Sequence, residues 1–306
     1  MGRLRRLIAR RRLRARGPAV SGWGSVELPG RGVTWAIDRA GPDPGAPTVV
    51  LLHGLAANGG LNWDPVIEPL AERFRVIALD HRGHGNGIRP HEPFALEDCA
   101  DDVAALLDVY GVGRAVLVGY SMGGAIAQLT WQRHPRRVAG LVLLATAARF
   151  DVPPGSELLT RLLAEVDRHN GHRPGLLGIS ATDIHHAVRS LADFDSRPWI
   201  DRRPVPATVL LTRKDRVVSP RLQRELAALV ADGQTTELEL GHLAVVLDRG
   251  AVGPAVREAC AGIAAESGLG RPFWRRRPRR RRRRRDGVRP PVRQRARSVL
   301  RSTADR

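Results

Sequence analysis

Cysteine is scarce in this chain of 306 residues, with only Cys99 and Cys260 present. Two cysteines so far apart exclude the disulfide framework of a small secreted domain, and they lack the paired spacing of a zinc site. The scarcity favours a reducing compartment. We therefore expect a cytoplasmic protein, with peripheral attachment at the inner membrane face as a variant of that location, and we expect no metal or organic cofactor.

Long hydrophobic runs are also missing. The longest, residues 138–148, contains a glycine and a threonine and has about half of the roughly 20 residues that a transmembrane helix needs. Near the N-terminus the apolar stretch Leu7–Ala9 is far shorter than the apolar region of an export signal. These two observations predict a protein without a membrane-spanning helix that is not exported.

Lysine is almost absent, since Lys214 is the single lysine among 50 basic residues. The arginines gather at the ends: residues 1–17 hold eight and no acid, and residues 271–306 hold seventeen against two aspartates. The remaining 253 residues carry 25 basic and 29 acidic side chains, against a net charge of +19 for the whole chain. This distribution excludes a nucleic-acid-binding domain whose positive footprint lies on folded surface.

The charge therefore predicts three parts: an Arg-rich tail over residues 1–17, a globular domain over 18–270, and an Arg-rich disordered tail over 271–306. Arginines beside Phe273 and Trp274 suit contact with an anionic membrane surface, each adding about 1 kcal/mol of attraction. RNA or another polyanion would attract the same charge without sequence preference. A solvated tail without a partner is the third reading.

Between the tails, apolar strands alternate with helix-period segments, a pattern typical of a parallel sheet with helices on both faces. A hairpin is expected over 24–38. The further expected strands are 48–53, 75–79, 115–118, 138–144, 207–212 and 235–240, and the expected helices are 62–73, 96–110, 122–134, 220–229 and about 243–265. The fold class is α/β, with about eight mostly parallel strands.

The alternation stops over about residues 146–203, which read as a helical, polar insertion and predict a lid or binding element. Four histidines fall in this lid insertion: His169, His172, His185 and His186. The adjacent pair points to different helix faces and no carboxylate spacing supports it, so a solvated lid is favoured over a metal site.

The sequence Gly119-Tyr-Ser-Met-Gly123 follows a buried strand and opens a helix of small residues. A serine on such a sharp strand-to-helix turn needs flanking glycines, here Gly119 and Gly123, so that strand and helix can pass closely. Ser121 is thereby presented as a nucleophile. The N–H of Met122, at the start of the helix, is a candidate donor to an oxyanion beside it.

A serine hydroxyl needs a base within reach and a carboxylate that orients the base. His242 follows the last strand and Asp215 follows the strand before it, both at the carboxyl edge where open α/β sheets place their sites. Asp248 is an alternative orienter. Three earlier histidines are expected to hydrogen-bond loop backbone instead: His53, His81 and His84. The second oxyanion donor is expected after an early strand, at the N–H of Leu55, where Gly54 permits close approach.

With these residues in place, residues 24–265 resemble the α/β-hydrolase fold family, in its esterase and lipase-like branch. Four ordered landmarks carry the resemblance: His53-Gly54, the segment Asp80–Gly85, the serine motif, and the late Asp215 and His242. The family commonly has a serine shortly after the second landmark, where this chain has Asn86-Gly87. In the related epoxide hydrolases and haloalkane dehalogenases, aspartate stands at the position of this serine. Ser121 therefore argues against both of these activities.

The expected activity is hydrolysis of a small or medium carboxylic ester or thioester through an acyl-enzyme on Ser121. The same triad also serves C–C bond hydrolases and cofactor-free haloperoxidase-like perhydrolases, which stay open as alternatives. A different class of function is a weakly catalytic scaffold that its basic tails dock to an anionic membrane or RNA. No specific nucleic acid is expected as a partner.

Overall fold

The structure is a computed structural model that describes residues 22–89, 92–152, 181–202, 204–230 and 233–269. Both Arg-rich tails and residues 153–180 of the lid insertion, with His169 and His172, lie outside these ranges. The boundaries expected for the tails and the lid therefore stay predictions.

Within the described ranges, eight strands form one sheet in the order β1-β2-β4-β3-β5-β6-β7-β8. The strands are β1 (Gly24–Leu28), β2 (Gly32–Arg39), β3 (Thr48–Leu52), β4 (Arg75–Leu79), β5 (Ala115–Tyr120), β6 (Val138–Leu144), β7 (Ala207–Thr212) and β8 (Gln234–Leu238). The hairpin strand β2 pairs antiparallel with both β1 and β4, and every pairing from β4 to β8 is parallel. The α/β class and the mostly parallel sheet are confirmed.

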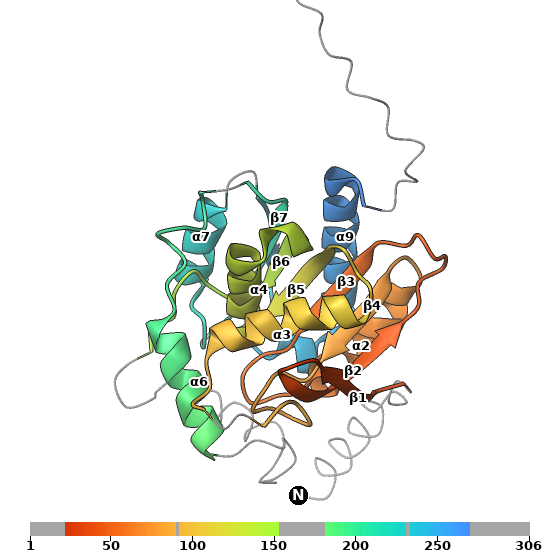
Figure 1. Cartoon of the computed structure of the whole chain (residues 1–306). Helices are drawn as coiled ribbons and strands as arrows, with labels where there is room; N and C mark the ends of the chain where they lie inside the picture. Colours follow the sequence, from red (N-terminus) through yellow and green to blue (C-terminus); the bar gives the residue numbers. More distant parts are fainter. Residues whose placement is uncertain (1–21, 90–91, 153–180, 203, 231–232, 270–306) are drawn as a thin grey trace, which may run out of the picture. The chain divides into compact units, whose positions relative to one another are not determined.

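Helices cover both faces of this sheet, as predicted (Figure 1). Their bounds are α2 (Gly59–Ala71), α3 (Leu96–Val109), α4 (Met122–Arg133), the short 3₁₀ turn η1 (Pro135–Arg137), α6 (Ala181–Asp193), α7 (Pro220–Leu229), α8 (Ala244–Leu247) and α9 (Arg249–Ser267). One apolar core joins the sheet to α3, α4, α6 and α7, and a second core joins it to α2, α8 and α9. The sheet is therefore the middle layer of three.

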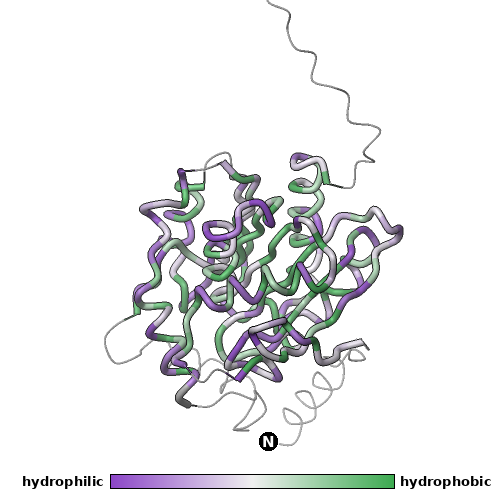
Figure 2. The backbone as a smooth tube through the Cα atoms, in the orientation of Figure 1, coloured by the Kyte–Doolittle hydropathy of each residue, from purple (hydrophilic) through white to green (hydrophobic). Residues whose placement is uncertain are grey.

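The central strands are buried on both faces, which explains their continuous apolar sequences. Every residue of β3, β5, β6 and β7 is buried, and these strands are green in the hydropathy view of Figure 2. The edge strand β8 differs, because four of its five residues are exposed and its sequence is correspondingly polar. Burial on both faces holds the carboxyl ends of the central strands in fixed positions, and the candidate site lies there.

The last helix differs from the prediction of one helix over about 243–265. Asp248 has φ −120° and ψ 45°, outside the helical region, and it separates α8 from α9. Two N–H groups of the following turn, those of Ala251 and Val252, donate to the Asp248 carbonyl, so a new helix starts there. The break lets the chain turn between His242 and the long helix α9.

The first helix after β3 also begins earlier than predicted, at Gly59 rather than Asn62. Asn58 caps it, with its side chain accepting from the N–H of Leu61 at 2.7 Å. Two glycines in the first turn conceal the start, because glycine is a poor helix former.

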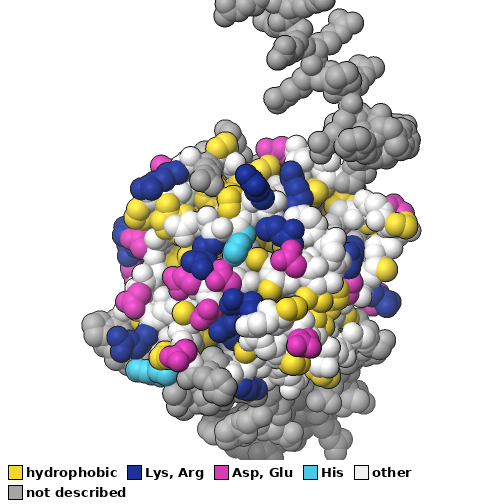
Figure 3. All heavy atoms as spheres, viewed as in Figure 1, with side chains coloured by type: hydrophobic (Ala, Val, Ile, Leu, Met, Phe, Trp, Pro, Cys, Tyr) yellow, Lys and Arg dark blue, Asp and Glu magenta, His cyan; other side chains and the backbone are white. Residues whose placement is uncertain are grey.

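The surface of the described body shows no single-sign field on the face drawn in Figure 3, where basic and acidic side chains are interspersed. This mixture agrees with the small net charge of the sequence between the tails. Among the described helices, none is long and apolar enough to cross a membrane.

Candidate active site

Ser121 lies in a strained turn between β5 and α4, with φ 53° and ψ −117°. Few non-glycine residues adopt such a conformation, and it persists only where the surroundings impose it. Here the Ser121 N–H donates to the Leu144 carbonyl at 3.0 Å, and the Thr146 hydroxyl donates to the Ser121 carbonyl at 2.8 Å. Both peptide groups of the serine are thus held by the end of β6.

The flanking glycines are needed for close packing. A Cβ on Gly119 would collide with the carbonyl of Gly123, and a Cβ on Gly123 would collide with the carbonyl of Leu52. Strand β5 and helix α4 therefore approach each other, and β3, more closely than any side chain would permit. This is the physical reason for the glycines in the motif.

The structure brings the three distant residues of the expected triad together. His242 Nε2 lies 3.1 Å from Ser121 Oγ, and His242 Nδ1 lies 2.8 Å from Asp215 Oδ2. All three side chains are buried. The alternative orienter, Asp248, is exposed at the start of α9, and the hydrogen bond from His242 goes to Asp215.

His242 is also held through its backbone. The Tyr120 hydroxyl donates to the His242 carbonyl at 2.8 Å, and the two rings lie 5.3 Å apart. Because Tyr120 precedes Ser121, the same strand end positions the serine and anchors the loop that carries the histidine. This contact fixes one side of the imidazole relative to the nucleophile.

The loop after β3 passes directly beside Ser121. A Cβ built on Gly54 would lie 3.4 Å from the Ser121 Cβ, and closer to the Tyr120 ring. The Gly54 N–H donates to Asn62 Oδ1 at 3.0 Å, and Ala56 is in the left-handed region at φ 54°. Leu55 thus lies in a tightly held segment next to the nucleophile, and Met122 opens α4. Their roles as oxyanion donors stay predictions.

Three buried histidines stand behind this loop. His53 donates from Nδ1 to the Gly54 carbonyl at 2.8 Å and accepts the His81 N–H at Nε2 at 2.9 Å. His84 Nδ1 donates to the Arg82 carbonyl at 3.0 Å. The expectation that these histidines bond loop backbone is right for His53 and His84. It is wrong for the His81 ring, whose two nitrogens have no hydrogen-bond partner among the described residues.

Burial keeps all three imidazoles neutral, because a charged ring would lose its hydration. It lowers the pKa of His53 to about 4, against a smaller raising effect of the bond to Gly54. Burial, followed by the nearby His53, lowers the pKa of His84 to about 3. For His81, burial together with its two histidine neighbours brings the pKa well below the ordinary value.

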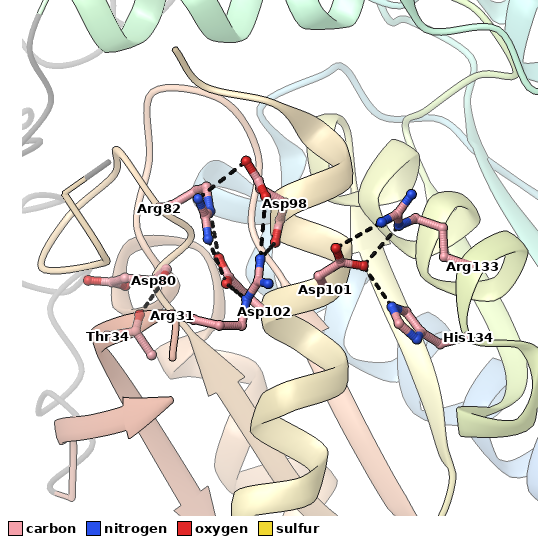
Figure 4. Close-up of polar contacts among 9 residues, drawn as sticks. All are labelled: Arg31, Thr34, Asp80, Arg82, Asp98, Asp101, Asp102, Arg133 and His134. Carbon is pink, nitrogen blue, oxygen red and sulfur yellow. Dashed lines mark hydrogen bonds and ion pairs between the residues drawn. The ribbon is translucent and has the colours of Figure 1, made fainter. Parts of the chain in front are cut away.

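The loop after β4 is fixed by a buried carboxylate on α3 (Figure 4). Asp102 accepts from Arg82 Nε at 2.7 Å and Arg82 Nη2 at 2.8 Å, and it also pairs with Arg31 of the β1–β2 hairpin. Asp98 contacts both arginines from the preceding turn of α3. Acidic side chains on one face of α3 therefore hold two other segments against this helix: the hairpin, and the loop that carries His81 and His84.

Replacing Asp102 with alanine should lower the free energy of unfolding by about 3 to 5 kcal/mol, because two guanidinium groups would lose their buried partner. Urea unfolding measures the change. Asp101→Ala is the matched control, since Asp101 is on the same helix but forms its pair with Arg133 and His134 on a more exposed face, where about 1 kcal/mol or less is expected. Equal losses for the two variants would contradict this assignment.

Of the four lid histidines, the structure describes His185 and His186. His185 and His186 lie on α6 with ring centres 5.9 Å apart, and no described group of three or more His, Cys, Asp or Glu side chains is arranged to hold an ion.

Four residues around the site were not anticipated from the sequence: Tyr120, Thr146, Thr212 and Gln223. A signal for one of them exists in α7, where Gln223 is buried beside Leu222 and Leu226. A glutamine on the apolar face of a helix requires buried hydrogen-bond partners. One of those partners is the nearby Asp215.

The sheet order, the strained serine turn and the converging side chains define an α/β hydrolase by fold. A model of the alpha/beta hydrolase fold matches residues 47–167. The chain therefore has the α/β-hydrolase fold.

Individual relatives and solved structures are similar to this chain in sequence or in fold. The chain is 35% identical over 114 residues to a protein named putative carbamate hydrolase RutD from Caulobacter vibrioides, a match that covers 37% of this chain and 42% of that protein. It superposes on the enol-lactonase from Burkholderia xenovorans with a TM-score of 0.64 and 25% identity, covering 78% of this chain and 100% of the other. It superposes on a thermophilic esterase from Thermogutta terrifontis with a TM-score of 0.64 and 25% identity, covering 79% of this chain and 99% of the other.

Proposed function

We propose that the protein is a serine hydrolase that cleaves a carboxylic ester or thioester through an acyl-enzyme on Ser121. The observation that carries the proposal is the continuous hydrogen-bond chain from Asp215 through His242 to Ser121 Oγ. In that chain the nucleophile contacts a base and the base contacts an orienting carboxylate, which are the three roles that acyl transfer requires.

In the proposed reaction, His242 Nε2 accepts the proton of Ser121 as Oγ attacks the acyl carbon. The N–H groups of Leu55 and Met122 stabilise the negative oxygen of the tetrahedral intermediate. The protonated His242 then gives its proton to the leaving alcohol or thiol, and the acyl group stays on Ser121. Water loses a proton to His242 as it attacks this acyl-enzyme, the acid leaves, and Ser121 regains its proton.

Asp215 has an electrostatic and orienting role in this scheme. Its bond to His242 Nδ1 selects the tautomer whose Nε2 is free to accept the serine proton. Its negative charge stabilises the imidazolium that forms in each half of the reaction, while the proton stays on the histidine.

The names of the similar proteins support hydrolysis in general and ester-type substrates in particular. An enol-lactonase and an esterase are among the structural neighbours, and a putative carbamate hydrolase is among the sequence relatives. Lactones, esters and carbamates all present a carbonyl carbon with an oxygen or nitrogen leaving group, which suits the attack geometry proposed for Ser121.

A fluorophosphonate probe tests the proposal directly. Ser121 Oγ should attack the phosphorus and displace fluoride, so mass spectrometry should find a single adduct on the peptide that contains Ser121. Prior denaturation should abolish the adduct, because the hydroxyl reacts only when His242 is in place. An adduct on another serine, or no adduct on the folded chain, would refute the assignment.

A substrate panel then separates the chemistries that share this triad. We expect turnover of p-nitrophenyl esters or thioesters, with a chain-length series defining the acyl preference. The panel also includes a carbamate, a vinylogous diketone and peracid formation from acetate and hydrogen peroxide. Faster turnover of the diketone or faster peracid formation would replace the ester assignment with a C–C hydrolase or a perhydrolase.

A further inference from the structure

The two oxygens of Asp215 have different partners. Oδ1 accepts the backbone N–H groups of Val217 at 2.8 Å and Val218 at 2.9 Å, which is a local turn contact. Oδ2 accepts His242 Nδ1 at 2.8 Å, the Thr212 hydroxyl at 2.8 Å and Gln223 Nε2 at 3.1 Å. The oxygen that faces the catalytic imidazole is therefore also the one held by two further side chains.

Gln223 reaches three separate parts of the site from α7, and it is fully buried. Its Oε1 accepts the Thr212 N–H at 2.9 Å, where β7 ends. Its Nε2 lies 2.8 Å from the Val218 carbonyl and 3.0 Å from Thr212 Oγ1. The orientation of the amide follows from these partners, because the Thr212 N–H can only donate and the Val218 carbonyl can only accept.

These contacts form one network of hydrogen bonds. The two Nε2 protons of Gln223 are shared among the Val218 carbonyl, Thr212 Oγ1 and Asp215 Oδ2. The Thr212 hydroxyl donates to Asp215 Oδ2, and His242 donates to the same oxygen. The terminal torsion of an aspartate side chain has broad minima, so the local turn at Oδ1 does not by itself fix how Oδ2 faces the imidazole. The side chains of Thr212 and Gln223 complete that restraint.

We propose that Gln223, together with Thr212, is a positioning residue that holds the Asp215 carboxylate in line with His242. This inference rests on the proposed function, in which Asp215 orients the catalytic base. In this role the amide of Gln223 affects the rate of the chemical step through Asp215, in addition to packing α7 against the sheet.

Gln223→Met tests this role, because methionine has a similar length and forms none of these hydrogen bonds. We expect kcat on an active p-nitrophenyl ester to fall about 10- to 100-fold, the range for a misplacement of about 1 Å. KM should change less than about 2-fold, because Gln223 contacts no triad member other than Asp215. The fluorophosphonate labelling rate should fall in parallel with kcat.

A double-mutant cycle with Asp215→Ala distinguishes positioning from general structural damage. If Gln223 acts through the carboxylate, Gln223→Met should lower the residual rate of the Asp215→Ala enzyme by less than about 2-fold. Loss of folding would lower the rate equally in both backgrounds. Thr212→Val, which removes only the hydroxyl contacts, should give a smaller fall in kcat that also disappears in the Asp215→Ala background.

Gln128→Met is the matched control. Gln128 is also fully buried and bonds the Gly124 and Ala147 carbonyls and Ser196, with none of the triad. We expect it to lower Tm about as much as Gln223→Met while kcat stays within about 3-fold of the wild type. Should Gln223→Met not fold, Thr212→Val carries the cycle.

An undiminished effect of Gln223→Met in the Asp215→Ala background would overturn the inference, as would a raised KM with unchanged kcat. Failure of the proposed function has a different signature. In that case the wild-type chain neither turns over esters nor labels at Ser121, whatever residue stands at position 223.

Discussion

Replacing Ser121 with alanine is expected to lower kcat on an ester substrate by about 10⁶-fold, the loss seen when the serine of such a triad is removed. His242→Ala should cost about as much, because a serine hydroxyl without its base is a poor nucleophile. Steady-state kinetics on a p-nitrophenyl ester, with single-turnover mixing for the slow variants, measures both values.

The double variant gives a sharper test than either single one. Ser121 and His242 act as a unit, so removing both should cost little more than removing one. Losses that instead multiply would mean that the two side chains contribute separately, and the proton transfer between them would have to be abandoned. The 3.1 Å contact between His242 Nε2 and Ser121 Oγ is the structural basis for expecting the non-additive result.

Ser190→Ala is the control for loss of a serine hydroxyl elsewhere. Ser190 lies on α6, where its hydroxyl accepts the N–H of Leu96 and contacts no member of the triad. It should leave kcat within about 2-fold of the wild type. A large fall for this variant would show that damage to the fold, and not loss of the nucleophile, lowers the rate.

Much of the architecture can be predicted from the sequence, because the strongest signals are local. The apolar runs that became β3, β5, β6 and β7 are buried on both faces, so continuous hydrophobicity identifies them without knowledge of their neighbours. The serine motif is a local sequence signal too, because its two glycines and the serine lie within five residues. Each of these features can be recognised from a short stretch of sequence, although the close approach of Gly123 to the Leu52 carbonyl is a contact with a distant strand.

The contacts among Ser121, Asp215 and His242 follow from motifs placed after successive strands, whereas other contacts between distant segments cannot be predicted from the sequence. The order in which β4 lies between β2 and β3, the burial of Gln223 beneath Asp215 and the break at Asp248 all depend on how layers pack. The same holds for His81, whose described neighbours offer no hydrogen-bond partner to its ring where the loop after β4 packs against His53. Sequence patterns place these residues on the correct elements but do not say what they contact.

The three buried histidines predict a strong loss of stability in mild acid. In the unfolded chain each imidazole takes up a proton near pH 6.5, whereas in the folded chain the pKa of His53 is lowered to about 4 and that of His84 to about 3. Between these values the unfolded state binds more protons, so the free energy of unfolding falls as the pH falls from about 6.5 toward 4. His53 alone accounts for about 3 kcal/mol over that window.

His81→Phe tests the origin of this slope. Each buried neutral histidine contributes about 1.4 kcal/mol per pH unit at pH 5, and phenylalanine does not titrate. Because neither nitrogen of the His81 ring has a partner in the described ranges, the variant loses no described side-chain hydrogen bond and should raise Tm at pH 5 more than at pH 7.5. Urea unfolding at several pH values measures the slope, and His185→Gln, which removes an imidazole at an exposed position of α6, is the control.

The direction of the His81→Phe effect separates two readings of the cluster. If the unpaired ring is only a destabilising buried polar group, the variant gains stability and keeps its ester hydrolysis. If stability at pH 7.5 falls instead by several kcal/mol, the ring makes an interaction that its unpaired nitrogens do not reveal, and the acid slope would need another source. In the first case the neutral tautomer of His53, which donates to Gly54 and accepts from His81, remains the element of the cluster that holds the loop beside Ser121.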